Sequence, residues 1–135
     1  MPMRVLISEP PMMEEIDRRF DVRGKPVVFA WGDIIYNPRG SFLGSALMAH
    51  EGLHGSRQGR GDARIRRWWE RYIEDDAFRL AEEIPAHRAE YHALCQSTHD
   101  RNWRARYLQQ IAAKLAAPLY GCLLTEPEAR RRLIT

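Results

Sequence analysis

The sequence predicts an α+β fold in which a small N-terminal β-sheet is followed by a mostly helical part. Runs rich in β-forming residues occur in the first 36 residues. After them, apolar residues recur at the three- and four-residue spacing of helices. The length of 135 residues and the 44% of apolar residues suit a single domain, residues 1–135, with a hydrophobic core of its own.

The N-terminal part contains two strand regions separated by a short helix. Residues 3–7 form a short apolar run, and residues 12–20 read as a helix with acidic residues in its first turn. In residues 25–36 the runs VVFAW and IIY flank the pair Gly32-Asp33, which is typical of a β-hairpin or a bent edge strand. Asn37-Pro-Arg-Gly then predicts a turn.

The remainder of the chain is expected to be helical. Ser41 and Asp62 are predicted N-caps, because their side chains can accept a hydrogen bond from a free backbone N–H at a helix start. Thr125 and Glu128 have the spacing of a capping box for a last short helix. The other helical patterns cover residues 41–58, 68–96 and 101–117.

Composition narrows the functional classes. The formal net charge is only +3, which permits a nucleic-acid partner without requiring one. The N-terminus lacks the basic segment and apolar run of a signal peptide, and no stretch approaches the roughly 20 apolar residues of a membrane span. We therefore expect a cytoplasmic protein that does not bind membranes.

His50-Glu51-Gly-Leu-His54 is an HExxH motif. On a helix, residues four apart share a face, so both imidazoles can bind one zinc ion while Glu51 lies beside it. Glu51 is the expected general base, which takes a proton from water and later gives one to the leaving amine. Because the histidines continue the apolar face of this helix, a zinc site explains them better than a role as two core histidines.

Catalytic zinc sites have three protein ligands, so a third ligand must lie downstream. The long helical pattern has an apolar stripe that predicts which side is buried. Glu83 lies roughly 70° from the centre of this stripe, Glu90 about 90° and Glu82 about 170°. Glu83 is therefore the predicted third ligand, and Glu82 is expected to point elsewhere. The stripe consists of Ile73, Ala77, Leu80, Ile84, His87, Tyr91 and Leu94.

An HExxH motif followed by a glutamate-bearing helix resembles the gluzincins, a branch of the zinc peptidases. The segment Glu83-Ile-Pro-Ala86 looks like their third-ligand segment, and the compact size resembles that of the minigluzincins. The runs Trp69-Glu-Arg-Tyr72 and Pro118-Leu-Tyr-Gly121 look like small peptidase-like proteins of phages and prophages. This likeness spans residues 34–135 and implies a zincin-like fold, a Zn²⁺ cofactor and a peptide or protein substrate.

The resemblance also implies roles for residues outside the motif. In gluzincins an aspartate four residues after the ligand glutamate bonds a zinc histidine, and His87 stands at that position here. His87 either supports the site or packs in the core. Residues 34–36 would be the edge strand that pairs with an extended substrate, or an ordinary strand. Tyr120 would stabilise the developing oxyanion, or pack in the core.

Two other functions are open at this point. Five arginines between residues 57 and 67 precede Trp68 and Trp69, so a nucleic-acid-associated protein with a zinc site is possible in principle. Acidic residues follow this run, which favours a solvated helix face and makes a nucleic-acid partner unlikely. An interaction protein with a structural metal is the other alternative, although closed structural sites have four protein ligands rather than three.

Overall fold

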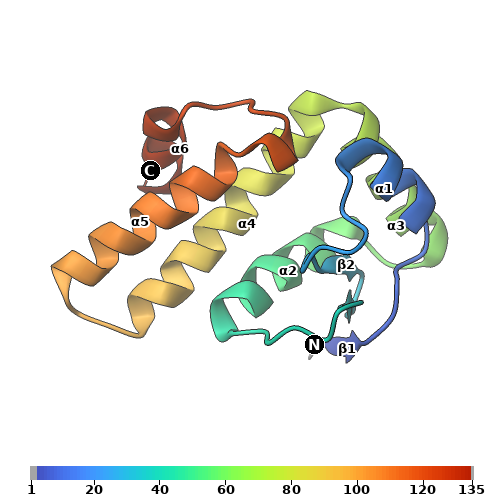
Figure 1. Cartoon of the computed structure of the whole chain (residues 1–135), viewed down its shortest axis with the longest axis horizontal. Coiled ribbons are helices and arrows are strands. Elements are labelled where there is room, and N and C mark those ends of the chain that lie inside the picture. Colours follow the sequence, from blue (N-terminus) through green and yellow to red (C-terminus); the bar gives the residue numbers. More distant parts are fainter. Residues whose placement is uncertain (1–2, 135) are drawn as a thin grey trace.

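The computed structural model describes residues 3–134 and confirms a mixed, mostly helical α+β fold (Figure 1). The strands are β1 (Arg4–Leu6), β2 (Phe29–Trp31) and β3 (Ile34–Tyr36). The helices are α1 (Met13–Phe20), α2 (Ser45–Gln58), α3 (Asp62–Glu74), α4 (Asp76–Gln96), α5 (Arg101–Leu115), the 3-10 helix η1 (Pro118–Tyr120) and α6 (Glu126–Ile134).

The three strands form one sheet in the order β1-β3-β2. Strands β2 and β3 form the predicted antiparallel hairpin, in which Trp31 lies opposite Ile34. The turn requires a left-handed backbone at Gly32, whose φ is 62°. Strand β1 runs parallel to β3 on its other side.

The prediction that β3 is an edge strand is wrong, because β1 occupies its second side. The Arg4 N–H donates to the Asp33 carbonyl at 2.8 Å, and the Asn37 N–H donates to the Leu6 carbonyl at 2.7 Å. Strand β3 is therefore central. The edge that lies against α2 is β2, whose three residues are all buried.

Helix α2 begins at Ser45, so the prediction that Ser41 caps it is wrong. The Asn37 side chain holds Ser41 in the preceding loop: its amide donates to the Ser41 carbonyl at 2.8 Å and its oxygen accepts from the Ser41 N–H at 3.2 Å. Gly44, in an extended conformation, precedes the helix instead.

Asp62 is also misassigned as a cap. It is the first residue of α3, and its carboxylate accepts hydrogen bonds from Arg66 and from the indole N–H of Trp31. By contrast, the predicted capping box at the start of α6 is present in part, since the Glu128 N–H donates to the Thr125 hydroxyl oxygen at 3.3 Å.

The long helical pattern of residues 68–96 is interrupted. Asp75 has an extended backbone (φ −115°, ψ 106°), and its carboxylate caps α4 by accepting from the Phe78 N–H at 3.0 Å. Helices α3 and α4 therefore differ in direction (Figure 1). The upstream part of the predicted stripe, including Ala77, does not share the buried face of α4.

Two apolar clusters flank the contact between α2 and α4. One combines α1, the sheet and α3, and the other combines α4, α5 and α6, as the arrangement in Figure 1 shows. The contact between α2 and α4 is instead rich in buried polar side chains. These are His50, Glu51, His54, Gln58, Glu82, Glu83, His87 and Glu90.

Gly55 is required where α2 crosses the hairpin. A Cβ atom at Gly55 would lie 2.0 Å from the Gly32 carbonyl oxygen, which belongs to the backbone and cannot turn away. Gln58, one turn later, donates to the Ala30 carbonyl at 2.9 Å and accepts from the Gly32 N–H at 2.7 Å. This close approach fixes the sheet against the HExxH helix. Gly52, in contrast, has no neighbour within 4 Å of an added Cβ among the described residues.

We predict opposite effects for alanine at these two glycines. Gly55→Ala should lower the free energy of unfolding by roughly 1–3 kcal/mol or more, because the methyl group forces the hairpin away. Gly52→Ala should raise it by up to about 1 kcal/mol through helix propensity alone. Urea denaturation measures both changes, and equal effects of the two substitutions would contradict the close approach.

Candidate metal centre

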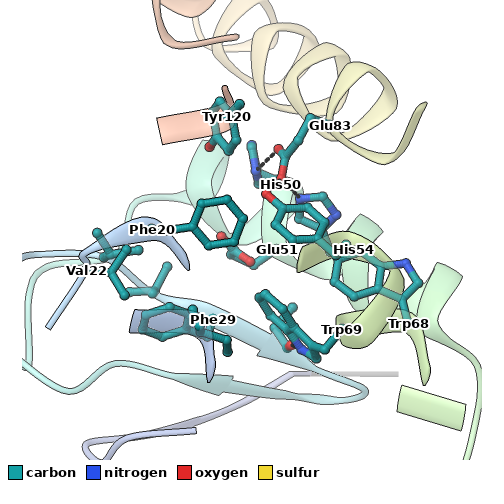
Figure 2. A pocket seen from close by; sticks show the side chains of 15 residues that line it. Phe20, Val22, Phe29, His50, Glu51, His54, Trp68, Trp69, Glu83 and Tyr120 are labelled. Atoms are coloured by element: carbon teal, nitrogen blue, oxygen red, sulfur yellow. Dashed lines mark hydrogen bonds and ion pairs between the residues drawn. The ribbon is translucent and has the colours of Figure 1, made fainter. Parts of the chain in front are cut away.

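The two histidines of the HExxH motif meet Glu83 in the contact between α2 and α4 (Figure 2). His50 Nε2 lies 3.4 Å from Glu83 Oε1, and His54 Nε2 lies 3.1 Å from Glu83 Oε2. Tetrahedral zinc with bonds of 2.0–2.1 Å separates its ligands by about 3.3 Å. The spacing of these three groups therefore fits one zinc ion, and all three side chains are buried.

Hydrogen bonding and charge in this cluster both favour a cation. Glu83 Oε1 is buried without a hydrogen-bond partner among residues 3–134. Burial acts to raise the pKa of Glu83, but His54 and His50 hold it well below its usual range. Burial would lower the pKa of His50, yet the carboxylates of Glu83 and Glu90 beside it raise it to about 10. The carboxylates thus stabilise a positive charge here, which a proton or a metal ion can supply.

Glu51 lines the cavity beside these ligands. In Figure 2 its side chain lies below His50, on the side that faces Phe20. Burial raises the pKa of the Glu51 carboxyl, although the neighbouring histidines His50 and His54 oppose this shift. A raised pKa brings a carboxylate closer to the range in which it accepts and returns protons near neutral pH.

Glu90 contacts His50 from the side opposite Glu83, a role that sequence reasoning did not assign. Its Oε1 lies 2.8 Å from His50 Nδ1, and its Oε2 accepts from Lys114 Nζ at 2.6 Å. Burial would raise the pKa of Glu90, but the hydrogen bond from His50 and the charge of Lys114 lower it to about 2. A carboxylate at this position orients a metal-binding imidazole. The seven-residue spacing from Glu83 is the signal that could have indicated it.

His87 is buried in the core and also contacts the site, because its Nδ1 lies 3.3 Å from Glu83 Oε1. Its Nδ1 lies 2.8 Å from the backbone carbonyl of Glu83 one turn earlier, and its ring packs edge-on against His50 at 4.6 Å between centroids. Burial lowers the pKa of His87, which favours the neutral ring. His50, His87 and Glu90 also lie close enough to form a metal-binding group. Lys114 already supplies the positive charge at Glu90, so we favour the group that contains His54 and Glu83.

Glu82 was expected to point elsewhere than Glu83, and it is nevertheless buried. Its side chain is 4% exposed, and it accepts hydrogen bonds from the guanidinium of Arg57 and from the indole of Trp68. It still lies outside the metal-binding groups. The angular argument distinguished Glu83 from Glu82 as the candidate ligand. It could not show the ion pair between Glu82 and Arg57, because Arg57 lies 25 residues away in the sequence.

Two tyrosines line the cavity. Tyr120, the predicted oxyanion donor, packs edge-on against His87 at 5.1 Å between ring centroids. Tyr72 was not predicted, and its hydroxyl donates to Glu83 Oε2. Burial and nearby carboxylates raise the pKa of both hydroxyls well above the usual value, so both remain proton donors. The fully buried Arg79 connects them, since it donates to the backbone carbonyls of both tyrosines.

The aromatic residues of the arginine-rich run do not face solvent. Trp68 and Trp69 are 7% and 6% exposed, and they belong to the apolar cluster beside the candidate metal centre. Arg57 is paired with Glu82, and Arg66 with Asp62. These indoles therefore offer no exposed surface on which a nucleic-acid base could stack.

A cavity of about 60 Å³ adjoins the ligands. This space is large enough to hold ordered water beside the ligands. Its polar wall is formed by the metal centre and the tyrosines. Its apolar wall comes from α1, the segment that follows it and the sheet, as Figure 2 shows for Phe20, Val22 and Phe29.

Comparison of the chain with known protein families, curated proteins and solved structures finds no match. In the part of the chain that the structure describes, no helix is both long and apolar enough to cross a membrane. What the chain does must therefore be inferred from the side chains of the site.

We predict that the purified protein binds one zinc ion through His50, His54 and Glu83. His54→Ala and Glu83→Ala should each weaken zinc binding by more than the roughly 10–100-fold that follows loss of a residue that only supports a ligand. Glu82→Ala is the matched comparison: it removes a buried carboxylate from the same helix that is not a proposed ligand, so it should weaken zinc binding far less than Glu83→Ala. Competition with a chromophoric chelator measures the affinities. Parental affinity in Glu83→Ala would contradict the assignment.

Proposed function

We propose that this chain is a zinc-dependent metallopeptidase with a zincin-like, gluzincin-type site. The observation that carries the proposal is the convergence of His50 Nε2, His54 Nε2 and a Glu83 carboxylate, with Glu51 beside them on the cavity. Three protein ligands leave the fourth zinc position for water or substrate. A fourth ligand would favour a structural site, but within residues 3–134 each metal-binding group has only three members.

A zinc ion held there would act as a Lewis acid on the peptide carbonyl and lower the pKa of water. The chain's own residues would move the protons. Glu51 accepts a proton from the attacking water and then delivers it to the amine nitrogen as the C–N bond breaks. Tyr120 is the proposed donor to the carbonyl oxygen as negative charge develops there. Its ring lies at the cavity, and its hydroxyl forms no hydrogen bond within the described residues.

The two alternatives have less support. A nucleic-acid-associated protein would use the arginine-rich run with its tryptophans, but both indoles are buried. An interaction protein with a structural metal does not explain why a buried glutamate, Glu51, faces the cavity without serving as a ligand. A general base at this position accounts for the cost of burying that carboxylate.

We predict that Glu51→Gln keeps zinc and fold but loses peptide hydrolysis by about 10²–10⁴-fold, because an amide cannot accept the water proton. Digestion of a diverse peptide mixture, followed by mass spectrometry, measures the loss without knowledge of the substrate. Glu70→Gln, an exposed change on α3, is the control and should retain activity. Cleavage by Glu51→Gln at the parental rate would falsify the role of Glu51.

A further inference from the structure

Three helices are connected by two short polar contacts that end at the metal centre. Lys114 in α5 donates to Glu90 Oε2 in α4 at 2.6 Å, and Glu90 Oε1 lies 2.8 Å from His50 Nδ1 in α2. Glu90 is 6% exposed, whereas Lys114 reaches it from the surface. The chain has two lysines among its 21 basic residues, and this is one of them.

The chemistry of imidazole gives this connection a consequence. His50 can bind a metal through Nε2 only if its remaining proton is on Nδ1. A Glu90 carboxylate that accepts this proton fixes the tautomer and the orientation of the ring. A buried carboxylate needs a positive partner to stay ionised and in place. Within the described residues, Glu90 forms ion pairs with two side chains, those of His50 and Lys114.

We propose that Lys114 is a positioning residue of the metal centre, which holds the Glu90 carboxylate in the orientation that fixes the ring of His50. The proposal rests on the metal centre proposed above and adds α5 to it. A purely structural role is the competing explanation. Lys114 lies in the last turn of α5, where a positive charge interacts favourably with the helix dipole. That role affects stability but does not act on zinc affinity.

A double-mutant cycle separates the two roles, with zinc affinity measured by chelator competition. Lys114→Met should weaken zinc binding about tenfold, at the lower end of the range for residues that support a ligand. Glu90→Gln should weaken it at least as much. The double variant should bind no more weakly than Glu90→Gln alone, because Lys114 acts only through Glu90. Lys114→Arg should restore most of the affinity, and Lys25→Met, the other lysine, is the control.

Each outcome of this experiment decides the proposal. Parental zinc affinity in Lys114→Met, or additive losses in the double variant, would overturn it. If Lys114→Met does not fold, Lys114→Gln replaces it under the same criteria. Because binding is measured rather than hydrolysis, loss of the peptidase proposal leaves this test intact. A parental protein that binds no zinc would overturn the metal centre and the role of Lys114 together.

Discussion

Helix α2 packs against α4 across buried carboxylates, and this packing depends on a partner of opposite charge for each carboxylate. Burying an ionised carboxylate costs several kcal/mol unless a charged partner and hydrogen bonds compensate it. Glu82 is compensated by a two-oxygen contact with Arg57 of α2, and Glu90 by His50 of α2 together with a lysine from α5. These directional pairs prevent the helices from sliding past each other. Glu83 and the histidines are therefore held at ligand spacing by contacts on either side of them.

Glu83 differs from Glu82 and Glu90 in its partners on α2. These partners are the Nε2 atoms of His50 and His54, which are the atoms that would bind a metal ion. His50 and His54 carry positive charge only after taking up a proton, and the pKa of His50 is raised to about 10. A proton and a metal ion therefore compete for the same place. Zinc binding at neutral pH should displace the proton from His50, so zinc affinity should rise with pH. The cluster thus holds a positive charge in either state, one from the proton or two from a zinc ion.

The sequence predicted the parts of the fold and site that depend on local spacing. The HExxH geometry follows from a four-residue separation on one helix, and the angular argument for Glu83 survives because Leu80, Ile84 and His87 also lie in α4. Features set by distant partners were not accessible. The burial of Glu82 depends on an arginine in another helix, and the central position of β3 depends on pairing with β1. The break between α3 and α4 at Asp75 could not be predicted either. Asp75 caps the new helix, but in the sequence it is one of several consecutive acidic residues.

The spacing along α4 explains why the two histidines of the candidate metal centre are held so differently. Residues seven apart on a helix are separated by two turns less about 20°, so Glu83 and Glu90 share one face. They contact opposite nitrogens of the same His50 ring, while His87 between them packs against its edge. One helix thus fixes His50 on three sides. His54 is held by Glu83 and by aromatic rings of α3, and its Nδ1 has no hydrogen-bond partner among the described residues. If the cluster holds a metal ion as proposed, we therefore expect His54 to be the ligand that adjusts its ring, with His50 as the fixed reference for the site.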